Sequence, residues 1–196
     1  MVRIFIIALA TLSLMACSTP NVYNDLNALP SAETGDHELG IAFGGVGVRG
    51  FMHLGVIKAL AEEGIVPDVV SGTSAGSIAA TLYASGLSYE EMEIAIDNVA
   101  MSDIADFVFS SKGLVNGKSL SEWINNQVIY DDLSEMPMPI ALTATNMTSR
   151  ETVIIRSGNP GHAVQTSSTI PGAFVPVENQ GDILVDGGIF SIVPVY

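Results

Sequence analysis

The sequence predicts an α/β fold with a mainly parallel central sheet, and the order of its first elements supports this prediction. Residues 39–43 and 69–71 are short apolar runs of the kind found in strands buried on both faces. Each run leads into a glycine-rich turn, and helices with apolar residues at helical spacing are expected over 51–63 and 75–84. A strand, turn and helix repeated in this order form a right-handed unit with parallel strands.

The later elements follow from the same kind of pattern. Ser88 and Glu91 form a capping box that predicts a helix ending near Val99. In the stretch that follows, packing in the core is the simpler interpretation of Phe107 and Phe109, and a lip that faces lipid is the alternative. Further elements are expected as helices at 118–128 and 161–169 and as strands at 140–145, 152–156 and 183–185.

Length and charge limit the classes of function. The chain has 196 residues, 48% of them hydrophobic, which is enough for one domain with a sizeable core and short for two. Its 21 Asp+Glu residues against 7 Lys+Arg give a formal net charge of −14. This charge argues against a nucleic-acid partner and against electrostatic attraction to an anionic membrane. Membrane contact would therefore require apolar groups or a lipid anchor.

The first residues are typical of a secretory signal peptide, which we expect over 1–16. Arg3 gives a positive start, and the apolar stretch from Ile4 to Leu14 is short for a membrane span. The block Leu-x-Ala-Cys that ends at Cys17 resembles the bacterial lipobox, in which the cysteine receives a diacylglycerol and becomes the mature N-terminus. An ordinary cleaved signal followed by a free thiol is the alternative interpretation.

Cys17 is the only cysteine, so it cannot close an internal disulfide. Lipidation there predicts a membrane-anchored lipoprotein of the bacterial cell envelope. Ser18 after the cysteine favours the periplasmic face of the outer membrane, by resemblance to sorting in enteric bacteria. Residues 17–37 are rich in proline, asparagine and acidic side chains and are expected to form a solvated tether, which leaves 38–196 as the folded domain.

A candidate nucleophile, Ser74, lies between the second strand and its helix, in the pattern Gly72-x-Ser74-x-Gly76. Glycines at these two positions let a serine sit on a strained strand-to-helix turn, because a side chain at either one would collide with neighbouring backbone. The amino end of the following helix would stabilise negative charge beside the serine. A plain glycine turn with an incidental serine is the alternative.

The first glycine loop reads Gly45-Val46-Gly47-Val48-Arg49-Gly50, which also fits the fingerprint of a dinucleotide-binding loop. That function requires an acid at the carboxyl end of the second strand, whereas Asp68 precedes this strand. We therefore favour a second use, in which backbone amides around Gly45 to Gly47 hold an oxyanion that forms at Ser74. Arg49 either braces this loop or is a solvated surface residue.

A serine nucleophile needs a base, and the chain offers few. An α/β-hydrolase places its histidine after the acid, but no histidine follows Asp186. His162 remains a weaker candidate than Asp186, which ends an apolar strand and precedes two glycines, Gly187 and Gly188. A desolvated Asp186 would then form a catalytic dyad with Ser74. The sequence shows no Cys/His cluster with metal-ligand spacing, so no metal is expected.

Three blocks together, Gly-x-Gly-x-x-Gly with Arg49, Gly-Thr-Ser-Ala-Gly and Asp-Gly-Gly, resemble the patatin-like phospholipase family, bacterial branch. The resemblance runs from about Leu39 to the end of the chain and includes the block Ser167 to Phe174. It implies a three-layer α/β/α fold, with Ser74 as nucleophile and Asp186 as its base. It also implies an oxyanion hole from the glycine loop and hydrolysis of phospholipid or lysophospholipid acyl esters without a cofactor.

The chain departs from the family pattern at two positions and in its length. Val46 stands where members commonly have a third consecutive glycine, and Ser191-Ile192 stand where they often have Asn-Asn. Only ten residues follow Asp186, so the domain is expected to be a truncated version or one in which later elements are dispensable. A catalytically inactive lipoprotein that binds lipid or a partner is the alternative function, and a nucleotide binder is the third.

Overall fold

The computed structural model describes three stretches of the chain: residues 20–30, 37–45 and 47–195. The predicted signal peptide over 1–16, the lipidation site Cys17 and the loop residue Val46 lie outside these described residues. Within them, no helix is both long and apolar enough to cross a membrane.

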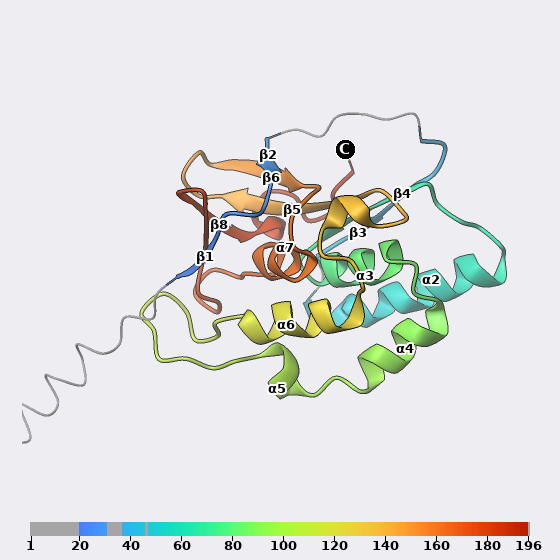
Figure 1. Ribbon diagram of the computed structural model, residues 1–196, viewed down its shortest axis with the longest axis horizontal. Helices are drawn as coiled ribbons and strands as arrows, with labels where there is room; N and C mark the ends of the chain where they lie inside the picture. Colours follow the sequence, from blue (N-terminus) through green and yellow to red (C-terminus); the bar gives the residue numbers. More distant parts are fainter. Residues whose placement is uncertain (1–19, 31–36, 46, 196) are drawn as a thin grey trace, which may run out of the picture.

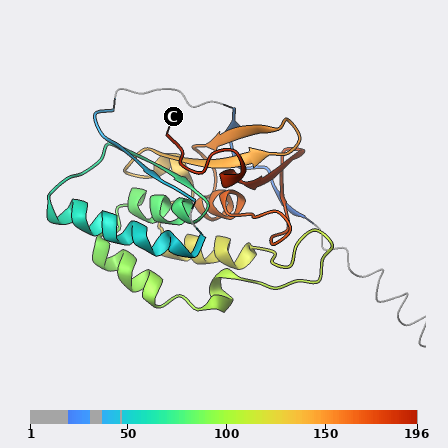
Figure 2. The ribbon, with the colours of Figure 1, turned by 180° about the vertical axis from the view of Figure 1, so that it is seen from behind.

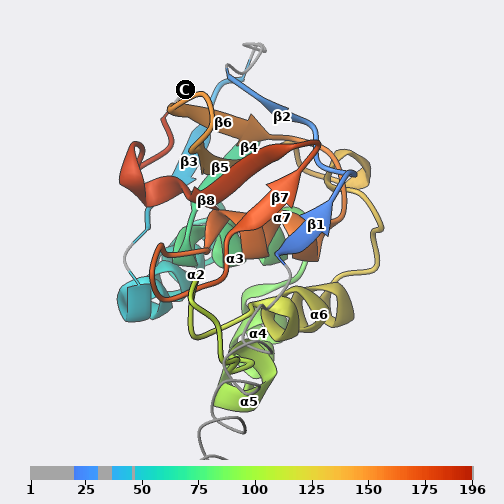
Figure 3. The same ribbon diagram turned by 90° about the vertical axis from the view of Figure 1, so that its left-hand side faces the viewer.

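In the part of the chain that the structure describes, eight strands form one sheet, which lies above the helices in Figures 1 and 3. Its main order is β1-β7-β8-β5-β4-β3, and β6 pairs with β5 and with β2. The strands are β1 (Asn21–Tyr23), β2 (Ala28–Leu29), β3 (Gly40–Phe43), β4 (Val69–Thr73), β5 (Ile140–Asn146), β6 (Glu151–Ile155), β7 (Val177–Asn179) and β8 (Asp182–Asp186).

The sheet is mixed rather than mainly parallel. β3, β4 and β5 are parallel to one another, as the repeated strand, turn and helix predict. In contrast, β6 and β8 are both antiparallel to β5, and β7 is antiparallel to β8. The length of the connections explains two of these pairings, since the turns at 147–150 (β5 to β6) and 180–181 (β7 to β8) are too short to return a chain for parallel pairing. β7 has no counterpart among the strands expected from the sequence.

Helices pack against this sheet, and Figures 1 and 2 show α2, α3, α6 and α7 below it. The helix after the first glycine loop begins with a 3-10 turn, η1, that the sequence pattern did not predict. The helices are η1 (Gly47–Phe51), α2 (Met52–Glu62), α3 (Ala75–Ala84), α4 (Tyr89–Asp97), α5 (Met101–Ile104), α6 (Lys118–Gln127), η2 (Leu133–Glu135), α7 (Pro160–Ser167) and η3 (Gly187–Ile189).

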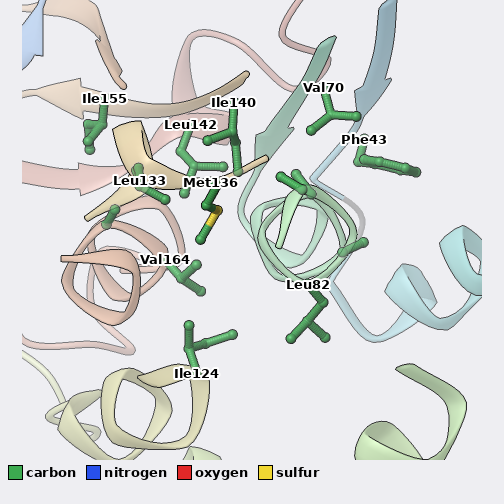
Figure 4. Close-up of a cluster of buried hydrophobic side chains, with 14 of the residues drawn as sticks. Phe43, Val70, Leu82, Ile124, Leu133, Met136, Ile140, Leu142, Ile155 and Val164 are labelled. Carbon is green, nitrogen blue, oxygen red and sulfur yellow. The ribbon is translucent and has the colours of Figure 1, made fainter. Parts of the chain in front are cut away.

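The hydrophobic core lies between the sheet and these helices. Figure 4 shows Val70 and Leu142 on the side of the sheet that faces α3 and α7, with Leu82 on the far side of α3, toward Ile124 of α6. All four are buried in one core cluster, which also contains Phe43 and Val164. Small residues fill most of α3, which therefore packs closely beneath β4. This close packing fixes the turn between β4 and α3.

The described part of the predicted tether is not a tether. β1 extends the sheet beside β7, β2 pairs with β6, and Leu26 between them is fully buried in the core. Asn179 donates from Nδ2 to the Leu26 carbonyl at 3.0 Å, which holds the connection in place. The local sequence is polar and lacks periodicity, so pairing with strands 125 to 156 residues away stabilises it.

The aromatic residues of the stretch after α5 do not pack in the core. Phe107 is 76% exposed and Phe109 is 94% exposed. Phe107 forms an isolated bridge with Val115, so that the two ends of a short apolar loop are tied together. The interpretation of these two residues as core is therefore wrong.

The burial of Leu26 predicts that the N-terminal strands contribute to stability. Leu26→Ala should lower the free energy of unfolding by about 2–4 kcal/mol, because it leaves a cavity in a closed part of the core. Val22→Ala in the neighbouring strand is the control and should change it by less than about 0.5 kcal/mol, since Val22 is exposed. Urea denaturation measures both changes in stability, and equal small effects would contradict the burial of Leu26.

Candidate active site

Two strand ends meet head to head on one edge of β5. Leu142 pairs with Gly72 of β4 on one side and Ile155 of β6 on the other, while Ala144 pairs with Asp186 of β8 opposite β6. β4 and β8 therefore occupy the same edge of β5 and run toward each other. β4 ends opposite Thr143 and β8 ends opposite Ala144, so the residues that terminate the two strands are brought together.

Ser74 occupies the turn between β4 and α3 in a strained conformation. Its φ of 53° and ψ of −125° lie in a region that residues with a side chain rarely adopt. The Ser74 amide donates to Ser167 Oγ at 3.0 Å, and its carbonyl accepts from the amide and the hydroxyl of Ser77 at 2.8 and 2.6 Å. These contacts hold the turn, and the serine hydroxyl projects from the amino end of α3.

The flanking glycines are required by close backbone contacts. A Cβ at Gly76 would lie 2.0 Å from the carbonyl oxygen of Phe43, and one at Gly72 would lie 2.6 Å from the carbonyl oxygen of Gly76. No real Cβ approaches a backbone oxygen so closely, and neither backbone can move without disturbing a strand or α3. The collision that the sequence pattern implied at both positions is therefore present in the structure.

Asp186 is the partner of the Ser74 hydroxyl. Ser74 Oγ donates to Asp186 Oδ2 at 2.6 Å, and both side chains are buried. Burial raises the pKa of Asp186 above its ordinary value, and the hydrogen bonds from Ser74 and from the Gly188 amide offset part of this rise. A carboxylate in such a place is a stronger base than one in water.

The two glycines after Asp186 shape its surroundings. The Gly188 amide donates to Asp186 Oδ1 at 2.6 Å, which leaves Oδ2 to face the serine. A Cβ at Gly187 would lie 2.5 Å from the carbonyl oxygen of Thr143, so this position must be glycine for η3 to turn against β5. The carboxylate is thus oriented by the turn that follows it.

The first glycine loop lies against the serine. A Cβ at Gly45 would lie 3.1 Å from Ser74 Cβ, and one at Gly50 would lie 2.9 Å from Ala75 Cβ. Gly47 has φ +57°, and Arg49 is exposed with no ion pair among the described residues. Nothing in the structure therefore supports a bracing role for Arg49.

The Gly45 amide is not free to hold an oxyanion. It donates to the carbonyl of Ile192 at 2.8 Å, so one of the amides expected around Gly45 to Gly47 to hold the oxyanion already has an acceptor. The first amides of η1 and of α3 remain as candidate donors, since the first N–H groups of a helix have no acceptor within it. Gly50, near the carboxyl end of η1, lies against Ala75 at the amino end of α3.

None of the histidines contacts the serine in the described part of the chain. His53 contacts the Gly44 carbonyl through Nε2 at 3.0 Å, and therefore supports the glycine loop. His162 stacks on Tyr23 and contacts Asp25 through Nδ1 at 2.8 Å, whereas His37 is exposed. Asp68, the acid considered for a dinucleotide site, accepts from the amides of Glu38 and Leu39, at the opposite end of the strands.

The carboxyl end of α7 contacts both halves of the site, a role that the sequence did not reveal. Ser167 accepts from the Ser74 amide, and the Thr169 carbonyl accepts from the Asp186 amide at 2.8 Å. The one signal was the run Ser167-Ser168-Thr169 before Pro171, where small polar residues end a helix. No cluster of three or more potential metal ligands occurs among the described residues.

Residues 41–196 match the family model described as patatin-like phospholipase. The match covers most of the chain, and the mixed sheet packs against helices, so the class of fold is the patatin-like α/β fold. The chain belongs to the patatin-like phospholipase family, which confirms the resemblance seen in its three motifs.

Curated relatives agree with this membership. An uncharacterized NTE family protein of Mycobacterium tuberculosis is 31% identical over 158 residues, which cover 80% of this chain and 27% of the relative. Lysophospholipase NTE1 of Mycosarcoma maydis is 30% identical over 80% of this chain and 9% of its own length. Patatin-like phospholipase domain-containing protein 7 of Mus musculus is 26% identical over 89% of this chain and 14% of its own length.

The chain thus spans about a quarter of the mycobacterial relative, and less of the other two. Among solved structures, VipD from Legionella pneumophila superimposes with a TM-score of 0.63 at 17% identity. The match covers 94% of this chain and 52% of VipD. At this identity the match shows a shared fold.

The close contact at Gly76 predicts that it cannot be replaced. Gly76→Ala should lower the free energy of unfolding by about 3 kcal/mol, because the added methyl group forces α3 and β3 apart. Gly55→Ala is the matched control, since a Cβ there meets nothing within 4 Å in α2. It should raise stability by about 0.5–1 kcal/mol through helix propensity. Equal effects of the two variants in thermal unfolding would contradict the packing at the turn.

The raised pKa of Asp186 predicts a stability cost at neutral pH. Its ionised form is less favourable in the folded than in the unfolded protein, so the cost is absent well below the ordinary value of 3.8 and grows as pH rises through the folded pKa. Asp186→Asn removes the charge and should be more stable than the wild type at pH 7. The difference should disappear near pH 3 in denaturant titrations. A variant less stable at pH 7 would contradict this.

Proposed function

We propose that the protein hydrolyses carboxylic esters of fatty acids, with phospholipids or lysophospholipids as substrates, through a dyad of Ser74 and Asp186. The 2.6 Å contact between Ser74 Oγ and Asp186 Oδ2 is the observation that carries this proposal. Family membership supports lipid esters as the class of substrate. The raised pKa of Asp186 supports its role as a base.

In the first half of the reaction, Ser74 Oγ attacks the ester carbonyl carbon while its proton passes to Asp186 Oδ2. The carbonyl oxygen becomes an oxyanion, and we infer that the first amides of η1 and α3 stabilise it. The C–O bond to the alcohol then breaks, and Asp186 returns the proton to the departing alkoxide. The fatty acyl group remains on Ser74 as an ester.

The second half repeats these roles with water. Asp186 accepts a proton from a water molecule whose oxygen attacks the acyl carbon, and the same amides stabilise the second oxyanion. The bond to Ser74 Oγ then breaks, the serine takes the proton back, and the fatty acid leaves. No step requires a metal or an organic cofactor, since each proton moves between groups of this chain and the substrate.

We further propose that Cys17 carries acyl chains and anchors the protein to a bacterial envelope membrane, at the periplasmic face. The lipobox-like block before Cys17 supports this localisation. Several acyl chains would bind stably, because each buried CH₂ contributes about 0.8 kcal/mol. Such an anchor would keep the site close to its lipid substrates.

Removal of either member of the dyad should abolish hydrolysis. Ser74→Ala and Asp186→Asn should each lower kcat/KM by at least about 10⁴-fold on a panel of acyl esters, because they remove the nucleophile and its base. A fluorophosphonate probe should label the wild type and not Ser74→Ala. Circular dichroism serves as the folding control. Wild-type protein that hydrolyses no ester of any chain length would instead favour the alternative of a non-catalytic lipid-binding lipoprotein.

The dependence of kcat/KM on pH should reflect the ionisation of the buried base, Asp186. Because Asp186 must be ionised to accept the proton, kcat/KM should fall about tenfold for each pH unit below its pKa. The midpoint of this fall should lie above 3.8, since burial raises the pKa. An uncharged ester substrate excludes titration of the substrate. A midpoint at or below the ordinary value would contradict Asp186 as a buried base.

A further inference from the structure

Exposed apolar side chains gather on four segments around the candidate active site, and we call these segments the rim: 47–52, 107–115, 170–175 and 187–195. Val48 is 88% exposed, and Phe51, Phe109, Ile170 and Phe190 are exposed as well. Side chains of this size are seldom left in water on several neighbouring loops without a function.

Backbone hydrogen bonds join the rim to the dyad. The Leu114 amide donates to the Ala173 carbonyl at 2.8 Å, and the Ala173 amide donates to the Ile170 carbonyl at 3.1 Å. The preceding residue, Thr169, accepts from the Asp186 amide. The segment 187–195 follows Asp186 directly, and 47–52 contacts the start of α3 through Gly50. Figure 3 shows η3, the start of α2 and the loop before α6 on one side of the molecule.

The charge of the rim is opposite to that of the chain. Its four segments contain none of the 21 acidic residues, although the whole chain has a net charge of −14. They contain two of the seven basic residues, Arg49 and Lys112. A surface with large apolar side chains, two cations and no acid complements a bilayer, where acyl chains lie beneath phosphate groups.

The start of the described chain lies at the same place. Asn21 of β1 donates from Nδ2 to the Asn116 carbonyl at 2.8 Å, next to the rim segment 107–115. Cys17 lies four residues before Asn21, and four extended residues span at most about 14 Å. An acyl group on Cys17 would therefore enter a membrane close to this part of the rim, and the body would have no long tether.

We propose that the rim docks on the surface of a phospholipid bilayer, with Phe107 and Phe109 inserted among the acyl chains and the dyad facing the lipids. This docking rests on the proposed lipid-ester hydrolysis for its purpose, but the contact itself is independent of turnover. It would deliver substrate from the plane of the membrane, without requiring a lipid to leave the bilayer. A protein partner on the same loops is the competing occupant, and the test separates the two.

The direct test is a fluorophore placed on the rim. In the full chain with Cys17→Ser and Ser74→Ala there is no cysteine left, so Phe109→Cys can be labelled with an environment-sensitive dye. With phosphatidylcholine vesicles, its emission should rise and shift to the blue, and lipids with nitroxide groups on their acyl chains should quench it. The same label at Ile129→Cys is the control, because Ile129 is 89% exposed and lies outside the rim.

The label at Ile129→Cys should stay in water. Equal quenching of both labels, a Phe109→Cys label that remains in water on bound protein, or absence of vesicle binding would each overturn the proposal. Because the chain tested is Ser74→Ala, the result does not depend on catalysis.

Turnover provides the second test. Phe107→Ser combined with Phe109→Ser should lower hydrolysis of vesicle phospholipid about tenfold or more, since less apolar surface can be buried, while kcat/KM on a soluble short-chain ester stays unchanged. Val66→Ser combined with Ile129→Ser is the matched control and should change neither rate, as both residues are exposed outside the rim. Equal losses on both substrates would contradict docking. A wild type inactive on all esters would refute the proposed function, while the labels would still decide the docking.

Discussion

The site depends on a single feature of the sheet: β4 and β8 share one edge of β5 and end head to head. β4 runs parallel to β5 and stops opposite Thr143, and β8 runs antiparallel and stops opposite Ala144. Ser74 and Asp186, which lie 112 positions apart, therefore become neighbours because the strands that carry them pair with the same strand. Because strand pairing is cooperative over the whole sheet, the two side chains need no mobile loop to meet.

Close packing of backbone on backbone holds this meeting point. Glycines at 72, 76 and 187 let α3 and η3 approach the strands at distances where any side chain would collide with a carbonyl group. The end of α7 then binds the amides of both dyad residues, through the Ser167 hydroxyl and the Thr169 carbonyl. Part of the stability gained in this way offsets the strained φ of Ser74 and the burial of a carboxylate, which are the two features a serine and its base require.

The uneven distribution of charge favours one orientation of the protein on a membrane surface. Acidic residues cover the body, while the segments around the site have none. The body would be repelled from an anionic surface only within a Debye length of about 8 Å at physiological salt, so apolar contacts of the rim can determine orientation at short range. The N-terminal strands contribute to this orientation, because Asn21 of β1 is held beside Asn116.

The sequence by itself determined the family, the α/β class and the identity of the strained turn, because glycine spacing reflects local backbone sterics. It also brought Ser74 and Asp186 forward as partners, through the elimination of histidines and a strand that ends in an acid. Only the tertiary structure decided the mixed pairing, the burial of Leu26, the exposure of Phe109 and the role of Ser167. These features depend on contacts between residues far apart in the chain. Such contacts turn the short polar segments of β1 and β2 into strands and leave the apolar loop 107–115 exposed to solvent.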